Sequence, residues 1–371
     1  MHLYLHIPFC RQACHYCDFH FSTNTSRKEE IVQAICREIS AQKDYLNGAQ
    51  LQTIYFGGGT PSLLTASELE SIFDAIGAHH SIASNAEITL EANPEDLTPE
   101  YCQTVASKGI NRLSIGIQSF QDKNLVLMNR NHQASDSIQA IKNAQEAGIS
   151  NISIDLIYGI PSNSPDDLTE DLVKATSIGV QHISAYSLTV EPKTVFGVQK
   201  KKGAFTEIPD AAMALAFTQV RDYLEAAGYE GYETSNFAKE GHYSIHNTSY
   251  WQQEPYLGVG PSAHSFNGYS RQWNVSNNAK YLAEGHLLAE KEELSPADQL
   301  NEYLMVRLRT KWGINLVEVR ERFHKMGQEY PEKEVQSWMA QGYARLEGEN
   351  LVLVNEGKLI ADRLSSDIFV V

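Results

Sequence analysis

Basic residues and long apolar runs are both scarce in this chain of 371 residues. Lys and Arg number 30 against 46 Asp and Glu, which leaves a net charge of −16. This balance argues against general binding of nucleic acids, which needs clustered cations. The longest apolar runs are strand-sized and fall short of the ~20 residues of a membrane-spanning helix. The start of the chain lacks the features of a signal peptide, so we expect a cytoplasmic protein without a membrane span.

Cysteine is also sparse, and its five copies are unevenly placed. Cys10, Cys14 and Cys17 have the spacing C-x3-C-x2-C, whereas Cys36 and Cys102 lie in helical patterns and are expected in the core. The odd count and the strained local pairings argue against a secreted disulfide scaffold. A structural zinc site would need a fourth ligand, and no fourth cysteine lies close to this run in the sequence. Three thiolates suit a [4Fe-4S] cluster with one open iron; the alternative is three ordinary reduced thiols.

Strand and helix patterns alternate through the first 230 residues. Short apolar segments predict buried strands at 3–9, 53–57, 87–92, 112–118, 151–159 and 182–188. Amphipathic segments predict helices at 28–45, 66–78, 99–107, 134–147 and 165–178. This rhythm predicts an α/β fold with a parallel sheet, either a curved partial barrel or a doubly wound sheet. In both architectures, chemistry gathers at the C-terminal ends of the strands.

The segments that follow these strands are polar or rich in glycine and proline. They are the cysteine loop and residues 57–61, 91–94, 118–120, 159–161 and 189–192. A single segment of this kind is most simply a loop. Several such segments on one rim of the sheet, with the three cysteines among them, favour one functional site to which all of them contribute.

The rest of the chain departs from this rhythm. After a helix at 210–226, residues 231–290 are rich in aromatic and polar side chains and are expected to extend the barrel domain of residues 1–230. Residues 291–371 predict a small, mostly helical domain of winged-helix type, with helices at 296–308, 316–323, 333–341 and 358–369 and a strand at 351–354. Its acidity argues against DNA binding.

The run Y-x-H-I-P-F-C-x3-C-x-Y-C at 4–17, followed by G-G-G-T-P at 57–61, resembles the start of a radical S-adenosylmethionine (SAM) protein. More narrowly, nearly the whole chain resembles the family that holds oxygen-independent coproporphyrinogen III oxidase (HemN) and the heme chaperone HemW. The resemblance implies a partial (β/α)6 barrel of TIM type. It also implies a [4Fe-4S] cluster on Cys10, Cys14 and Cys17, with SAM at the open iron.

Several rim residues match positions that bind SAM in this family. The glycines would let the backbone approach the methionine part of SAM, and Arg130 offers a fork for its carboxylate. Asp155 is the one charge in its strand, and an isolated buried charge needs a partner. The alternatives are a loose turn for the glycines, a surface salt bridge for Arg130 and a solvated strand end for Asp155. The residues that the resemblance implies as SAM-binding are Tyr4, Gly57, Gly58, Gly59, Thr60, Glu91, Gln118, Arg130 and Asp155.

Two features separate the branches of this family. The oxidase carries a fourth cysteine two positions after the third cysteine of the run, where this chain has Phe19. The oxidase also has an extension before its first barrel strand, and the predicted strand at Leu3 leaves no room for one here. Phe19 is expected to pack around the cluster with Phe9 and Tyr16, excluding water. Both departures favour the chaperone branch.

The run H-N-x-x-Y-W at 246–251 resembles a signature of the chaperone branch. A histidine can ligate heme iron, and the aromatic neighbours can stack on a porphyrin, so His246 is the candidate heme ligand. His242 and His264 are weaker candidates. The alternative is that Tyr250 and Trp251 are ordinary core residues.

The predicted function is a cytoplasmic heme chaperone that binds a [4Fe-4S] cluster, SAM and heme and delivers heme to an acceptor hemoprotein, which can be a membrane protein met from the periphery. The rival hypothesis is the oxidase, which decarboxylates coproporphyrinogen III with SAM as oxidant. A third is a radical SAM enzyme with an unrelated substrate and no affinity for heme. Catalytic residues are not assigned, because these residues do not distinguish cleavage of SAM from binding alone.

Overall fold

The computed structural model describes residues 1–161, 163–284 and 290–370. Its largest feature is a sheet of twelve strands in the order β12-β11-β10-β9-β1-β2-β3-β4-β5-β6-β8-β7. Six neighbouring parallel strands form its centre: β1 (His2–Ile7), β2 (Leu51–Gly58), β3 (Ile82–Ala92), β4 (Arg112–Gln118), β5 (Asn151–Tyr158) and β6 (His182–Ser187). The predicted α/β fold with six parallel strands is confirmed.

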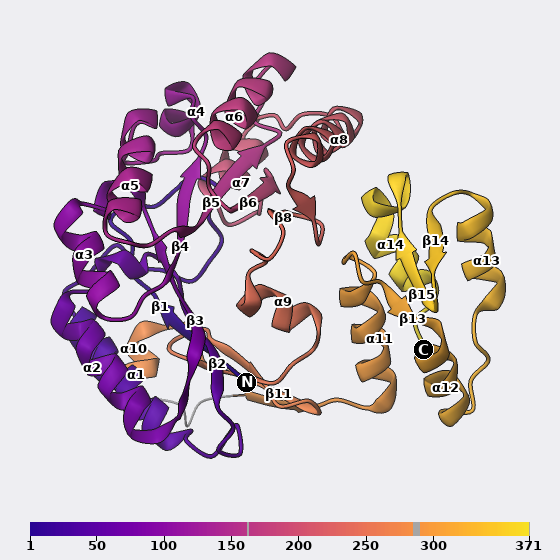
Figure 1. Ribbon diagram of the computed structural model, residues 1–371, viewed down its shortest axis with the longest axis horizontal. Coiled ribbons are helices and arrows are strands. Elements are labelled where there is room, and N and C mark those ends of the chain that lie inside the picture. The colour runs from indigo at the N-terminus through magenta and orange to yellow at the C-terminus, as the bar shows by residue number, and fades with distance from the viewer. Residues whose placement is uncertain (162, 285–289, 371) are drawn as a thin grey trace.

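Five helices follow these strands and lie along the outer face of the curved sheet (Figure 1). They are α1 (Lys28–Ala41), α2 (Ala66–His79), α3 (Pro99–Ser107), α5 (Ala134–Glu146) and α6 (Pro165–Ser177). Thr65 and Thr98 cap α2 and α3, because their side chains accept hydrogen bonds from backbone N–H groups of the first turn. Helix α1 ends four residues before the predicted Tyr45, since the chain turns there toward Asn47 and Gly48, both at positive φ.

The main core fills the space between the sheet and these helices. Leu3, Leu5 and Ile54 of the strands and Ile35 and Ile72 of the helices are fully buried in it. Cys102 is likewise fully buried, and Cys36 packs against the same cluster. The two cysteines outside the C-x3-C-x2-C run are therefore part of the packing, as predicted.

The segment after α8 (Asp210–Ala226) adds strands to both edges of the barrel sheet. β7 (Glu230–Gly231) and β8 (Asn236–Ala238) continue it antiparallel beyond β6, and β9 (Tyr256–Val259) pairs in parallel with β1. Helix α9 (Ile245–Trp251) connects these two edges. The remaining strands are β10 (His264–Phe266), β11 (Ser270–Trp273) and β12 (Glu290–Glu293). Residues 285–289 of the predicted extension lie outside the described residues, and the boundaries at 230 and 290 stay predictions.

Three short helices complete this part of the chain, and none of them was predicted. They are α4 (Asp122–Leu127), α7 (Val195–Lys201) and α10 (Asn278–Glu284). Helices of six or seven residues show too few turns for their apolar spacing to be read from the sequence. Two of them, α4 and α7, lie beside the cysteine loop.

The C-terminal domain has its own core and a small sheet of order β13-β15-β14. Its elements are α11 (Pro296–Arg307), β13 (Ile314–Asn315), α12 (Leu316–Lys325), α13 (Glu332–Ala340), β14 (Ala344–Glu347), β15 (Asn350–Leu353), the 3-10 helix η4 (Asn355–Ile360) and α14 (Ala361–Asp367). The winged-helix type is as predicted, although one strand was expected where three are present. The domain lies beside the barrel on the side of α9 (Figure 1). Among the described residues, no helix is both long and apolar enough to cross a membrane.

Candidate functional site

The cysteine loop follows β1 and is fixed at both of its flanks. Backbone bonds join Cys10 N–H to Ser22 O (3.1 Å) and Ser22 N–H to Pro8 O (2.9 Å). At the other flank, the side-chain amide of Asn129 donates to Ala13 O at 2.8 Å. Because these bonds hold the loop from two directions, the cysteines are presented on a pre-organised segment.

The three cysteines of the loop are free thiols. Burial raises the pKa of Cys10 to about 12 and also raises that of Cys17, while a hydrogen bond with Thr60 favours the Cys10 thiolate. Without a metal the thiols of Cys10 and Cys17 therefore stay protonated near neutral pH. Within the described ranges, no three His, Cys, Asp or Glu side chains meet as they would around one ion. A [4Fe-4S] cluster does not require this, since each thiolate binds a different iron.

Arg130 joins the cysteine loop to the strand ends. Its Nη1 donates to Cys14 Sγ at 3.4 Å, and its Nη2 donates to Asn93 Oδ1 at 2.8 Å and to Gly116 O at 2.6 Å. Its Nε is buried and has no hydrogen-bond partner among the described residues. The guanidinium is thus an enclosed cation with a spare donor beside the cysteines, and the surface salt bridge considered from the sequence is not the arrangement seen.

Gln118 lies next to this guanidinium in a strained backbone conformation. It is the last residue of β4 and has a φ of 70°, which is uncommon for a residue other than glycine. A Cβ built on Gly116 would lie 2.9 Å from Gln118 Nε2 and 3.4 Å from Arg130 Nη2. Both side chains therefore lie over Gly116. Such backbone strain is typical of binding sites, where it aims a side chain at a ligand.

The three glycines at the end of β2 allow close packing against β1. A Cβ on Gly58, which has a φ of 107°, would lie 2.6 Å from the His6 ring, and one on Gly59 would lie 2.7 Å from Phe9 O. The N–H of Gly58 donates to Glu91 Oε2 at 3.1 Å, and the N–H of Gly59 donates to Ile7 O at 2.9 Å. The N–H groups of Gly58 and Gly59 are therefore used inside the protein.

Two carboxyl groups lie inside the barrel beneath this rim. Glu91 accepts a hydrogen bond from Tyr55 OH at 2.8 Å, and burial raises its pKa to about 7. Asp155 accepts from Ser114 Oγ at 3.4 Å, and burial raises its pKa to about 6 against the opposing effects of Ser184 and Arg112. Both groups thus have partners, as a buried carboxyl requires, yet both can change protonation near neutral pH.

Tyr4 and Thr60, the other residues of the expected SAM-binding set, lie near the cysteines and these carboxyl groups. The Tyr4 ring stacks on the Tyr55 ring, with centroids 6.1 Å apart, and its hydroxyl bonds to His6 Nδ1 at 3.2 Å. Thr60 is buried between Cys10 and Asn93, whose amide donates to its hydroxyl at 3.4 Å. The structure therefore gathers the predicted SAM residues at one rim, while their contacts with SAM stay predictions.

The expectation for Phe19 is wrong. Phe9 is 2% exposed, but the side chain of Phe19 is 74% exposed and lies on the surface. The turn closed by Cys17 N–H and Cys14 O is followed by two exposed residues, Asp18 and Phe19, because it directs the chain outward. Phe19 thus does not shield the cluster site.

His246 of α9 is almost fully buried, and both of its ring nitrogens are hydrogen-bonded. It is 1% exposed, its Nδ1 lies 2.6 Å from Thr53 Oγ1, and its Nε2 lies 2.8 Å from Tyr250 OH. Its ring stacks on Tyr55, with centroids 4.8 Å apart. In this arrangement neither nitrogen is open to an iron atom, and the assignment of His246 as a heme ligand stays a prediction.

The direction of each bond around His246 follows from a carboxylate at the protein surface. Glu254 accepts from His2 Nε2 at 2.7 Å, so the His2 ring, whose pKa is lowered by burial, accepts at Nδ1 from the Thr53 hydroxyl at 2.9 Å. Thr53 then accepts from the N–H at His246 Nδ1. His246 Nε2 is left as the acceptor of the Tyr250 hydroxyl.

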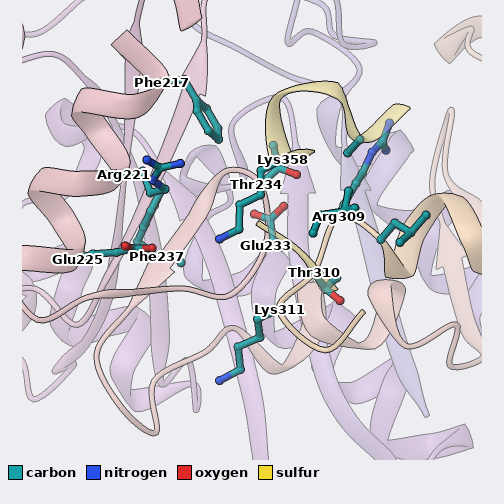
Figure 2. A pocket seen from close by; sticks show the side chains of 14 residues that line it. Phe217, Arg221, Glu225, Glu233, Thr234, Phe237, Arg309, Thr310, Lys311 and Lys358 are labelled. Atoms are coloured by element: carbon teal, nitrogen blue, oxygen red, sulfur yellow. The ribbon is translucent and has the colours of Figure 1, made fainter. Parts of the chain in front are cut away.

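A cavity of about 790 Å³ separates α9 from the C-terminal domain. Tyr186, Asn247, Tyr250 and Trp251 line it from the barrel side, and Leu359 lines it from η4. Small-molecule sites typically enclose about 300–1,000 Å³ between apolar and aromatic walls. A smaller pocket, shown in Figure 2, adjoins this cavity and shares Glu233, Arg309 and Lys358 with it.

Comparison with known proteins identifies the family. Residues 4–175 match the radical SAM superfamily, and residues 294–360 match the HemN C-terminal domain. The heme chaperone HemW of Synechocystis sp. is 38% identical over 84% of this chain and 78% of its own. The heme chaperone HemW of Mycobacterium tuberculosis is 33% identical over 97% of this chain and 92% of its own. The chain belongs to the HemW family.

The fold of this HemW family member is also that of a solved structure. Coproporphyrinogen III oxidase (HemN) from Escherichia coli, described as a radical SAM enzyme, matches 98% of this chain and 89% of its own with a TM-score of 0.84. The two sequences are 19% identical, so the match shows a common fold and no more. The predicted resemblance to this family is confirmed.

Sequence reasoning missed several residues that the HemW family fold brings to the site. Tyr55 links Glu91 to His246, and Asn93 links Arg130 to Thr60. The alternation in β2 could not single out Tyr55, because strands of a parallel sheet are apolar on both faces. Asn93 had a usable signal, since it directly follows β3 on the rim where chemistry was expected.

Proposed function

We propose that this protein is a heme chaperone that holds a [4Fe-4S] cluster, SAM and heme and passes heme to an acceptor hemoprotein in the cytoplasm. The observation that carries the proposal is the position of α9. Its Tyr250 and Trp251 face a cavity of suitable size, while its His246 stacks on Tyr55, which bonds to Glu91 at the proposed SAM site. The names of the HemW relatives support the same function.

The cluster would be held by Cys10, Cys14 and Cys17, with Arg130 donating to the Cys14 sulfur. When bound, the cluster supplies an open iron for SAM and the electron that its reductive cleavage needs. Arg130, whose Nε has no hydrogen-bond partner in the described part of the chain, would bind the SAM carboxylate. Glu91 and Asp155 would accept from the ammonium and ribose groups. Gln118 would orient toward the same ligand.

In the arrangement seen, His246 would act on heme through Tyr250; the direct ligation predicted from the sequence would require its Nε2 to leave the Tyr250 hydroxyl. Its Nε2 accepts the phenol hydrogen and so holds the Tyr250 ring in one orientation at the cavity wall. Trp251 adds a second aromatic surface to the wall, and aromatic rings pack well against an apolar macrocycle. In this proposal His246 is a positioning residue for heme binding.

We expect SAM affinity to fall as pH is lowered from about 8 to about 6, by up to about tenfold for one linked proton. Burial raises the pKa of Glu91 to about 7 and that of Asp155 to about 6, so acid neutralises the carboxylates that would face the SAM ammonium. Calorimetry on the reconstituted protein at several pH values measures this slope. Glu91→Gln should flatten it, and a wild-type affinity that rises toward acid would contradict the assignment.

The chaperone proposal is tested by titrating the purified protein with hemin. We expect a Soret band distinct from that of free hemin and transfer of heme to an apo-hemoprotein. Tyr250→Phe should change the band, and His246→Gln should weaken it less than His246→Ala, because glutamine can still accept the Tyr250 hydrogen bond. Production of protoporphyrinogen IX from coproporphyrinogen III, by reconstituted protein with SAM and a reductant, would instead establish the oxidase.

A further inference from the structure

Two cations without partners line the C-terminal side of the cavity. Lys358 of η4 is partly buried and Arg363 of α14 is exposed, and neither side chain has an ion pair or hydrogen bond among the described residues. Arg309 in the same wall is neutralised, since its Nη2 lies 2.5 Å from Asp362 Oδ1. In a chain with a net charge of −16, two free cations on one wall are a local exception.

The carboxylates near Lys358 are engaged elsewhere or lie beyond bonding distance. Glu233 accepts from Ser235 N–H at 3.0 Å and from the Asn236 side-chain amide at 2.5 Å. Glu230 pairs with Lys311 at 2.8 Å. Figure 2 shows Lys358 between α8, which carries Glu225, and Arg309, which lies in the turn after α11. Burial lowers the pKa of Lys358 against the opposing charges of Glu225 and Glu230, as expected for an ammonium group that has no ion pair among the described residues.

The cavity offers apolar walls on two sides of these cations. Tyr250 and Trp251 of α9 face it from the barrel, and Leu359, which is 39% exposed, faces it from η4. The smaller pocket opens beside Lys358 and is too narrow for a ring system. A ligand that matches this shape is flat and apolar at its centre and carries two flexible carboxylate arms at one edge.

We propose that Lys358 and Arg363 bind the two propionate groups of heme, with the macrocycle between Trp251 and Leu359. One arm would reach Lys358 at the mouth of the smaller pocket, and the other would stay at the rim beside Arg363. This inference rests on the proposed heme-binding function and adds the C-terminal domain to the heme site. The domain would then close over the ligand and be tied to the barrel by it.

Hemin and hemin dimethyl ester, which lacks free carboxylates, are the probes that test this. The wild-type protein should bind the ester at least about tenfold more weakly, as loss of a charge-assisted contact implies. Lys358→Gln and Arg363→Gln should each lower hemin affinity several-fold and leave ester affinity unchanged, and Lys358→Arg should restore binding. Lys325→Gln, an exposed site on α12, is the matched control. Thermal unfolding of each variant checks that it is folded.

The outcomes separate this inference from the function on which it rests. If wild-type protein binds hemin and the ester equally well, or if folded Lys358→Gln and Arg363→Gln both bind hemin like wild type, the propionate assignment is overturned and heme binding stands. If wild-type protein binds neither probe, the proposed heme function is overturned and the propionate assignment falls with it. Because Arg363 is exposed, its variant should fold even if Lys358→Gln does not.

Discussion

Replacing Cys10, Cys14 and Cys17 together with serine should abolish iron binding after anaerobic reconstitution. The wild-type chain is expected to hold about four irons and to show a broad thiolate-to-iron absorption band. The loop that carries these cysteines is fixed at both flanks by bonds to Ser22 and Asn129, so the substitutions should leave its backbone in place. Iron content and absorption then report loss of ligands rather than loss of fold.

The matched control is Cys36→Ser, because Cys36 packs in the main core away from this loop. Its Sγ donates to Ser71 O at 3.5 Å, a bond that a serine hydroxyl can also make. We expect this variant to keep the wild-type iron content. Wild-type iron in the triple variant would place the cluster elsewhere and would remove the basis for the SAM site.

The barrel was predictable because its signals are local. Each strand of the parallel sheet is a short apolar run, and helices α2 and α3 begin at the capping residues Thr65 and Thr98. The added edge strands have no such signals. Strand β9 is part of the sheet because Tyr256 lies opposite His2, a pairing between residues more than 250 positions apart that no local pattern reveals.

The site was predictable to the extent that strand order determines it. Parallel strands bring their C-terminal ends to one rim, so the cysteine loop, Gly58 and Glu91 were expected together and lie together. The environments of single side chains were not predictable. A histidine beside Tyr250 and Trp251 reads equally well as a ligand or as a buried residue, and only the bonds to Thr53 and Tyr250 show that its nitrogens are occupied.

The surroundings of Lys358 were likewise not predictable from the sequence. In the sequence it is one cation in a polar stretch near the C-terminus, with nothing to distinguish it from a solvated surface residue. Lys358 becomes a candidate ligand-binding residue only in the folded protein, because η4 places it where the C-terminal domain meets α8 and α9. A contact between domains depends on two surfaces at once, and the sequence of either one does not describe it.

Arg130→Ala should lower the affinity for SAM by about tenfold or more while iron content stays near that of wild type. The side chain is enclosed, its Nε is the one buried donor of the guanidinium without a partner among the described residues, and it lies beside Cys14. A charge-assisted hydrogen bond to a carboxylate contributes about 1.5–3 kcal/mol, which corresponds to this loss. Calorimetry with SAM on reconstituted protein measures it.

Arg130→Lys distinguishes charge from geometry in the same experiment. Lysine keeps the positive charge near Cys14 but cannot donate to Asn93, Gly116 O and a ligand in one plane, so its affinity should lie between those of Arg130→Ala and wild type. Arg320→Ala on the exposed face of α12 is the control and should change nothing. If Arg130→Ala binds SAM as tightly as wild type, the guanidinium serves only to hold the cysteine loop against β4, and the carboxylate of SAM must be bound by another group.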